Sequence, residues 1–477
     1  MLVTLAVPTY AEASFERIEI ELDRPADCWL ADDIDRDGDV DLVLIRQAAN
    51  PGSPVHEAVV IRQNPTGRFA FSERQEFSLH SPVGVYDLAD VAAGASLELL
   101  QLTDSGLNYY RVDGAQFDTV AHALVTPSKT PHLPPIASPQ RWDCAWPLFD
   151  SEKEAVVLPY LDHLEVWRLG EGEEYQHTGT IPCPVAGQRA TDGTGYQMML
   201  PELQAHSSPN ALELFFESGD HWHGIRRSAP EQTDFSTSLS FDSESSTIGQ
   251  VMGIAPDFRA GCLMQDLNAD GAPDVVRWAN HGGINSASCH IAVYFGPFNG
   301  SLSAQPHSEV SVEGIYGYPR FGDLNGDDRL DMLVCAMETG SLTTAKMFVM
   351  KRLSLHLLAY RQREDNTFST VADRRQSTDY KLDLDVPDPI HGPLVTFAGD
   401  LDGDGFDDFV FQTGSDRLDI YRGHPEDMID DDSPQHLECA PARSISSLDV
   451  DGDGRPDLLL HHSNSESGDA ITTLLAR

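Results

Sequence analysis

This chain is predicted to be an all-β protein built from repeats, and three observations support that prediction. A motif of alternating aspartates recurs five times along the 477 residues. Short apolar runs of strand length precede and follow each copy. Weaker units fill the long gap between the first two copies. A repeat of roughly 50 to 60 residues suits a blade of four antiparallel strands, so we expect a β-propeller.

The composition allows a substantial core under a strongly acidic surface. Hydrophobic residues make up 40% of the chain, and 76 acidic residues against 32 basic ones give a formal net charge of −44. Such a surface repels nucleic acid, because phosphate binding needs clustered Lys and Arg. No run of about 18 apolar residues occurs, so we expect no membrane span. We expect a monomer, and a preference for divalent cations.

The first 13 residues are expected to be the remnant of a signal peptide. A short apolar stretch ends in Ala11-Glu-Ala13, which fits the small residues around a cleavage site. The basic region that opens a signal peptide is missing, so the true start is expected upstream; the alternative is an ordinary flexible N-terminus. We therefore expect an extracytoplasmic protein (periplasmic, secreted or at the cell surface), with residues 14–477 as a single propeller domain.

The aspartate motif has nine positions, with oxygen-bearing side chains at positions 1, 3, 5 and 9. Glycine at position 6 supplies a positive φ in four copies, and Asp328 stands there in the third. Position 7 can offer its backbone carbonyl. Hard oxygen ligands at this spacing favour Ca²⁺ over Mg²⁺ and transition metals, so we expect about five calcium sites. The expected ligands are Asp33, Asp35, Asp37, Asp39, Asp41; Asp266, Asn268, Asp270, Ala272, Asp274; Asp323, Asn325, Asp327, Arg329, Asp331; Asp400, Asp402, Asp404, Phe406, Asp408; and Asp449, Asp451, Asp453, Arg455, Asp457.

An EF-hand shares these nine positions and must be excluded. It needs Glu at position 12 and a helix on each side. Position 12 is Leu44, Arg277, Val334, Phe411 and Leu460 in the five copies. The flanking runs are apolar and rich in β-branched residues, which favours a unit of strand, loop and strand.

Three degenerate units keep the strand after the loop but lose the ligand set. Their loops are Asp90–Gly94, Phe149–Glu154 and Glu202–Asn210. With them, units start near residues 33, 90, 146, 202, 266, 323, 400 and 449. Eight units predict eight blades, with seven as the alternative if one unit is an insertion. The last unit has room for three strands only, so we expect the alternating segment Phe15–Leu22 to supply its fourth and close the ring.

The aspartate loop followed by an apolar strand resembles the FG-GAP/VCBS repeat, the propeller repeat also found in integrin α chains. The resemblance is clear over the five loops and inferred over the rest. It implies that the loop residues bind Ca²⁺ and stiffen the blade. The upstream half of the repeat is poor, with Phe321-Gly322 and Phe397–Gly399 as its best remnants, so integrin-like ligand recognition is not implied.

Two functions remain open on the sequence. The first is a non-catalytic binding module for a protein or a polysaccharide, stabilised by calcium. The second is a polysaccharide-active enzyme of the lyase type, which needs a base and cations around a substrate carboxylate. No catalytic motif is assigned; the densest cluster is His221-Trp222-His223 with Arg226 and Arg227, which ordinary cross-strand packing also explains.

A basic segment interrupts the acidic chain between units six and seven. Eight of the 32 basic residues lie between Lys346 and Lys381. They are expected to pair with the acidic body, with an anionic ligand as the alternative. Within the segment, Leu353–Leu358 is expected to be a strand and Gln362–Asp379 an exposed loop.

Overall fold

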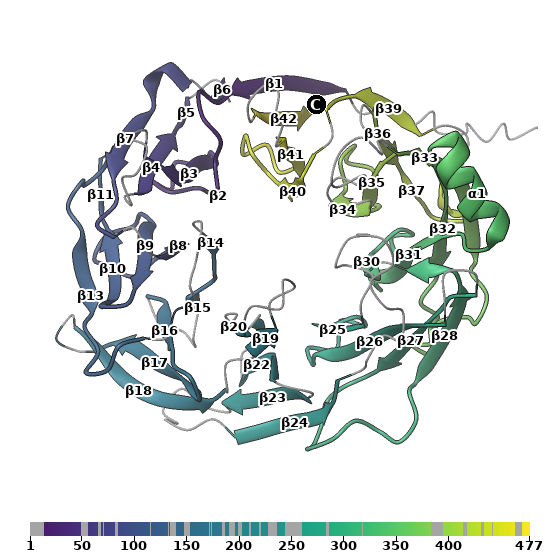
Figure 1. Ribbon diagram of the computed structural model, residues 1–477, viewed down its shortest axis with the longest axis horizontal. Coiled ribbons are helices and arrows are strands. Elements are labelled where there is room, and N and C mark those ends of the chain that lie inside the picture. Colours follow the sequence, from purple (N-terminus) through teal and green to yellow (C-terminus); the bar gives the residue numbers. More distant parts are fainter. Residues whose placement is uncertain are drawn as a thin grey trace, which may run out of the picture.

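The protein is a closed ring of eight blades, as Figure 1 shows. The computed structural model describes residues 14–477 apart from short segments, so the expected signal-peptide remnant at 1–13 lies outside the described residues. The prediction of an all-β, eight-bladed propeller is confirmed; within the described chain the one α-helix is α1 (Ser341–Met350). The internal segments not described are 49–55, 65–67, 70, 82–83, 115, 132, 134–139, 147–152, 171, 173, 184–186, 190–195, 199–202, 209–210, 219–220, 228–235, 244–259, 283–285, 317, 383–394, 414–416, 431–433, 441 and 463–469.

Each blade is built on antiparallel strands, and its first strand lies towards the centre of the ring (Figure 1). Blades 1 to 4 contain β2 (Cys28–Asp32), β3 (Asp41–Gln47), β4 (His56–Ile61) and β7 (Gln75–Ser78); β8 (Val85–Ala89), β9 (Glu98–Thr103), β10 (Gly106–Tyr110) and β13 (His122–Val125); β15 (Ala145–Trp146), β16 (Ala155–Pro159), β17 (His163–Leu169) and β18 (Tyr175–Pro182); and β21 (Gln204–Ser208), β22 (Ala211–Ser218), β23 (His221–Arg227) and β24 (Ser236–Asp242).

Blades 5 to 8 follow the same order along the chain. They contain β25 (Gly261–Gln265), β26 (Asp274–His281), β27 (Ser288–Tyr294) and β28 (Ser308–Glu313); β29 (Ile315–Tyr316), β30 (Arg320–Gly322), β31 (Asp331–Met337), β32 (Arg352–Tyr360) and β33 (Arg374–Lys381); β34 (Val395–Gly399), β35 (Asp408–Gln412), β36 (Arg417–Tyr421) and β39 (Gln435–Glu438); and β40 (Ser444–Leu448), β41 (Asp457–His462), β42 (Ala470–Ala476) and β1 (Phe15–Glu21). Smaller elements are β5 (Gln63–Asn64), β6 (Arg68–Phe69), η1 (Phe71–Glu73), β11 (Val112–Asp113), β12 (Gln116–Phe117), β14 (Gln140–Arg141), β19 (Gly187–Arg189), β20 (Tyr196–Met198), β37 (Gly423–His424) and β38 (Met428–Ile429). In blade 2, the short strand β14 adds to the inner side of β8 in parallel.

The N-terminal strand closes the ring, as predicted. Strand β1 pairs antiparallel with β42 over its whole length, from Phe15 opposite Ala476 to Glu21 opposite Ala470. The two ends of the described chain therefore share one blade (Figure 1). Because β1 covers the outer edge of blade 8, the last three strands are not left with an open edge.

The core consists of apolar layers between neighbouring blades. Strands buried on both faces, such as Leu42–Ile45 in β3, contribute side chains to two layers at once. Ile20 of β1 joins the layer between blades 8 and 1, with Leu459 and Ile471 on one side and Leu42 on the other. Closure of the ring therefore has both a hydrogen-bonded and a hydrophobic component.

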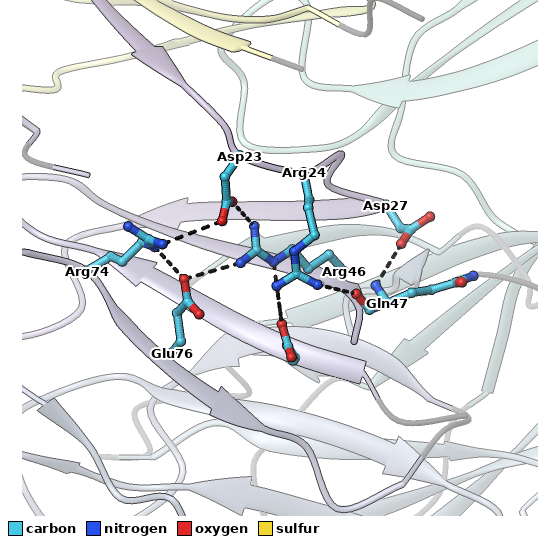
Figure 2. Close-up of polar contacts among 8 residues, drawn as sticks. Asp23, Arg24, Asp27, Arg46, Gln47, Arg74 and Glu76 are labelled. Atoms are coloured by element: carbon cyan, nitrogen blue, oxygen red, sulfur yellow. Dashed lines mark hydrogen bonds and ion pairs between the residues drawn. The ribbon is translucent and has the colours of Figure 1, made fainter. Parts of the chain in front are cut away.

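A network of charges holds the segment that leaves β1 against blade 1. The Arg46 guanidinium is almost completely buried and donates to Asp23 at 2.5 Å and to Glu76 at 3.2 Å. Arg74 pairs with the same two carboxylates, as Figure 2 shows. Arg24 donates to Glu57 at 2.6 Å. A buried guanidinium is stable only where carboxylates neutralise it, so this network fixes the path from blade 8 into blade 1.

A buried carboxylate joins blades 2 and 3. Asp87 of β8 accepts the backbone N–H groups of Cys144 at 2.8 Å and Ala145 at 3.1 Å. Burial, with a smaller contribution from Asp143, raises the pKa of Asp87 to about 7. The charged form is therefore costly in the folded state.

We expect Ile20→Ala to loosen the ring closure. Removing this buried side chain should lower the free energy of unfolding by about 2–4 kcal/mol, measured by urea denaturation followed by tryptophan fluorescence. The matched control is Glu21→Ala on the exposed face of the same strand, for which we expect a change within about 0.5 kcal/mol. Equal effects of the two substitutions would contradict the docking of β1.

We expect Asp87→Asn to reduce the loss of folding stability that the unmodified protein shows as pH rises towards 7. Because the folded-state pKa of Asp87 is raised above its unfolded value, its contribution is most favourable at low pH and is lost as pH rises towards 7. The stability of the Asn variant relative to the unmodified protein should thus increase between pH 5 and pH 8 in chemical denaturation. Asp113→Asn, on an exposed carboxylate, should show no such trend.

Candidate calcium loops

The five aspartate motifs connect the first strand of a blade to the second. They lie between β2 and β3, β25 and β26, β30 and β31, β34 and β35, and β40 and β41. All five therefore lie on the same face of the ring, beside its inner strands (Figure 1). Strands flank every copy, which confirms the exclusion of an EF-hand.

The aspartate at position 1 organises each loop by accepting backbone N–H groups. In the fourth loop, Asp400 accepts from Asp404 at 2.9 Å and from Gly405 at 2.8 Å. The position-5 carboxylate then accepts the N–H of position 7, as Asp404 does from Phe406 at 3.0 Å. Equivalent bonds recur in the other loops. These contacts wind the chain so that side chains at alternate positions converge.

Two positions of the loop adopt positive φ, and the sequence analysis recognised only one. At position 6, φ is between 63° and 99°, and Asp328 adopts this left-handed region as predicted. Position 4 is also left-handed, with φ between 55° and 77°. The position-4 residues are Arg36, Ala269, Gly326, Gly403 and Gly452. Glycine at three of these five positions was the available signal.

The structure brings the carboxylates of positions 1, 3 and 5 together in three loops. In the first, fourth and fifth loops, one oxygen from each of the three aspartates lies within 4.8 Å of the others. Three oxygens of these aspartates are buried without a hydrogen-bond partner among the described residues, namely Asp35 Oδ1, Asp449 Oδ1 and Asp451 Oδ1. Buried carboxylate oxygens need a partner, and converging hard oxygens fit a divalent cation such as Ca²⁺.

The second and third loops carry Asn at position 3. The Asn268 amide donates to Asp270 at 3.1 Å, and the Asn325 amide donates to Asp331 at 2.6 Å. In each loop the amide oxygen is the atom that would act as a ligand. These loops hold one carboxylate fewer than the others at positions 1, 3, 5 and 9, so we expect them to attract a cation less strongly.

The aspartate at position 9 is buried and bonded to the backbone. Asp408 accepts the N–H of Leu401 at position 2 at 3.0 Å and that of Gly423, beyond the third strand of the blade, at 3.1 Å. Asp274 and Asp457 accept the equivalent pairs. This carboxylate thus ties the loop to its own blade, a role that the sequence analysis did not assign. Its role as a ligand stays a prediction.

Burial raises the pKa of all five position-9 carboxylates. The values are about 6 for Asp41 and Asp457, about 7 for Asp274 and Asp331, and about 8 for Asp408. Neighbouring loop aspartates add to the increase. A proton or a nearby cation therefore stabilises this part of every loop.

Residues at position 7 reach the loop of the preceding blade. A Cβ atom added to Gly326 would lie only 2.6 Å from the Phe406 ring. A Cβ atom added to Gly403 would lie 3.5 Å from the Arg455 guanidinium. Arg329 instead pairs with Asp327 of its own loop at 2.7 Å. The backbone carbonyl of position 7 stays a predicted ligand.

Backbone hydrogen bonds join the loops of successive blades. The N–H of position 8 donates to the carbonyl of position 1 or 2 in the preceding loop. The bonds are Val40 to Val450 at 3.1 Å, Leu97 to Ile34 at 2.8 Å, Glu154 to Asp90 at 2.9 Å, Leu330 to Leu267 at 3.2 Å and Asp407 to Asp323 at 2.8 Å. Position 8 is Pro273 in the second loop and Pro456 in the fifth, and proline has no N–H to donate.

Arginines from outside the motifs approach three of the loops. Arg62 lies 3.3 Å from Asp35 and also contacts Asp41. Arg422, which like Arg62 directly follows the third strand of its blade, lies 3.3 Å from Asp402. Arg477 pairs with Asp451. These guanidinium groups offset part of the repulsion among the carboxylates.

The His221-Trp222-His223 cluster lies on β23, in the outer half of blade 4. His221 pairs with Asp242 at 2.9 Å, and the His223 ring stacks on Phe216 with centroids 5.6 Å apart. Arg226 donates to Glu213 at 2.5 Å. The cluster is thus engaged in cross-strand packing.

The basic segment is more ordered than predicted. Leu353–Leu358 lies in β32 as expected, but Arg374–Lys381 forms β33, so the prediction of an exposed loop to Asp379 was wrong. Its alternating exposure marks an outer strand, where polar side chains face solvent. Arg352 lies 3.5 Å from Asp379 and Arg374 lies 3.7 Å from Asp427, which agrees with internal pairing.

Comparison with known proteins bears on the family and the fold. A family model described as the FG-GAP-like repeat matches residues 266–334 and 400–460. No curated protein matches the chain. Among solved structures, a lectin of Agrocybe aegerita that recognises non-reducing terminal N-acetylglucosamine aligns over 97% of this chain and 95% of its own, with 11% identity and a TM-score of 0.42.

A second solved structure, Sqt1 from Chaetomium thermophilum, aligns over 96% of this chain and 100% of its own, with 10% identity and a TM-score of 0.43. Similarity at this level carries no functional argument. No helix within the described ranges has the length and apolar character needed to cross a membrane. The two matched segments contain four of the aspartate loops, in blades 5 to 8. The chain is therefore a β-propeller, and two segments in its blades 5 to 8 match the FG-GAP-like repeat.

Proposed function

We propose that this protein is a calcium-stabilised, non-catalytic binding module that acts as a monomer outside the cytoplasm. The observation that carries the calcium role is the convergence of three aspartate oxygens within 4.8 Å in each of three loops. The side chains at positions 1, 3 and 5 would hold the ion. Bound Ca²⁺ would neutralise these carboxylates and cross-link the turn. Extracytoplasmic calcium suits such loops, since extracellular modules bind in the range of about 10⁻⁴ to 10⁻³ M.

A cleft between blades 5 and 6 supports the binding role. It has a volume of about 460 Å³ and lies between β28 on one side and β32 with β33 on the other. That volume is within the usual range of ligand sites, about 300 to 1,000 Å³. Its lining is Ser311, Val312, Glu313, Gly314, Glu338, Thr339, His356, Leu358, Tyr360, Thr370, Val371, Ala372 and Arg375.

The chemistry of this cleft favours a polysaccharide that carries carboxylates. Arg375 offers a cation to a carboxylate, while Glu313 and Glu338 offer acceptors to sugar hydroxyls. The exposed side chain of Val371 gives an apolar surface for the carbon face of a sugar ring. In a chain with net charge −44, a basic group in a cleft is the feature that would admit an anionic ligand.

One observation supports the enzyme alternative. The same cleft contains His356 near Arg375, the groups a lyase would need as base and carboxylate partner. Burial, and then the nearby Arg375, lowers the pKa of His356, so its imidazole is neutral and can accept a proton at neutral pH. In such a reaction the base takes the proton α to the carboxylate, the β C–O bond breaks to leave an unsaturated sugar, and the departing oxygen takes a proton from solvent.

We expect chelation to lower the melting temperature of the protein, and added CaCl₂ to restore it. A ligand that binds only the folded state stabilises it by about 2.7 kcal/mol at a hundredfold excess over Kd. Asp402→Asn should remove about one bound ion in calorimetric titration and reduce the effect of chelation. Asp113→Asn, outside the loops, should change neither. Identical melting curves with and without EDTA, after verified metal removal, would refute the calcium role.

We expect Arg375→Ala to abolish binding to carboxylated polysaccharides such as polygalacturonate or alginate, measured by affinity electrophoresis. Arg352→Ala on the neighbouring strand, whose side chain pairs with Asp379, is the matched control and should bind normally. Neutral glucan should not be retained. Appearance of the ultraviolet absorbance of unsaturated sugars, lost in His356→Ala, would replace the binding assignment with the lyase. Failure of the unmodified protein to bind any acidic polysaccharide would overturn the proposed ligand class.

A further inference from the structure

Blade 2 has a loop at the place of an aspartate motif, but the ligand set is missing. In the nine residues from Asp90 to Glu98, position 3 is Ala92 and position 5 is Gly94, so two of the carboxylates are missing. The loop nevertheless connects β8 to β9, as the clear motifs connect the first and second strands of their blades. Sequence alone therefore indicates a loop that has lost its cation.

The position-9 contact survives in this loop. Glu98 is fully buried and accepts the N–H of Val91 at 3.0 Å and that of Ala92 at 3.0 Å. The bond to Val91 is the one that Asp408 makes to Leu401 in the fourth loop, at 3.0 Å. The longer glutamate thus replaces the aspartate in its bond to position 2, while its second bond goes to position 3 of the same loop instead of to the end of the third strand.

An ammonium group lies among the oxygens of this loop. Lys153, which lies two residues before β16 of blade 3, contacts the Asp90 carboxylate at position 1 through its Nζ atom. The same Nζ donates to the carbonyl of Gly94, at position 5, at 2.8 Å. Arg36, at position 4 of the first loop, donates to the other Asp90 oxygen at 2.7 Å. The Lys153 and Asp90 side chains are 11% and 14% exposed, so solvent screens this pair only partly.

The backbone around Lys153 joins the two blades. The Glu154 N–H donates to the Asp90 carbonyl at 2.9 Å, and the Glu154 carboxylate accepts the Asp90 N–H at 2.9 Å. Asp407 and Asp323 form the same reciprocal pair between blades 7 and 6, at 2.8 Å and 2.7 Å. Lys153 is therefore directed into the blade 2 loop by an arrangement that the ring uses elsewhere.

We propose that the Lys153 ammonium is the resident cation of the blade 2 loop and replaces a metal ion there. Lys153 and Arg36 together supply two positive charges, as one divalent ion would. Three blades contribute to the contact: Arg36 from blade 1, the loop from blade 2 and Lys153 from blade 3. This junction is consequently stable without metal, while the aspartate loops respond to calcium.

Hydrogen exchange can distinguish a junction that is stabilised by Lys153 from one that is stabilised by a metal ion. In the unmodified protein, EDTA should leave exchange at the amides of Val91, Ala92 and Glu154 unchanged. In Lys153→Met, exchange at these amides should accelerate, in calcium and in EDTA alike. Lys129→Met, on an exposed lysine, is the control and should leave exchange unchanged. The Met variant should also melt about 2 °C or more lower, by the same amount with and without calcium.

Two results would overturn this assignment. The first is EDTA-induced exchange at Val91 and Ala92 in the unmodified protein, which would indicate a metal ion in the blade 2 loop. This measurement needs no variant, so it remains decisive even if Lys153→Met fails to fold. The second is a folded Lys153→Met protein with unchanged exchange and melting. If instead EDTA alters no part of the protein, the proposed calcium role fails, while the Lys153→Met comparison still tests the lysine.

Discussion

The hydrogen bond from position 8 of one loop to position 1 or 2 of the preceding loop is the constraint on which the face of this propeller depends. It is a backbone contact, and it recurs around the ring from blade 8 through blade 1 to blade 3 and from blade 5 to blade 7. Because the loops of blades 1, 2 and 6 both donate and accept this bond, the conformation of each sets the position of the loops on either side of it. Any cation that stiffens a loop thus also stiffens a junction between blades.

Each loop gathers carboxylates that repel one another, and the chain offsets this repulsion in different ways. Three loops bring three aspartate oxygens together, where a divalent ion fits best. Arg62, Arg422 and Arg477 place guanidinium groups against the same loops. In blade 2, Lys153 lies between the remaining oxygens. Some loops can therefore accept a divalent ion, whereas in the blade 2 loop a lysine of the chain neutralises the carboxylate. The stability of the different loops should thus respond unequally to chelation.

The repeat was predictable because its residues are local: nine positions, glycine at position 6 and the apolar strand that follows were readable in order. The count of eight blades and closure by β1 followed from spacing and from the alternation of Phe15–Leu22, and both are confirmed. Strand β33 was missed because nearly all of its residues are polar or charged, as in an exposed loop. The binding of Asp408 to Gly423 was missed because the two residues lie 15 positions apart.

The sequence by itself determined the unit, its number and the chemistry of its loops, because alternating side chains and left-handed glycines act within a few bonds of one another. Only the tertiary structure decided which loops contact one another and which cationic side chains neutralise their carboxylates. Lys153 follows Asp90 by 63 residues, and no local pattern connects the two. The cleft around Arg375 likewise exists only because β28 of one blade faces β32 and β33 of the next. Contacts between blades depend on ring geometry, which sets distances that spacing along the chain does not encode.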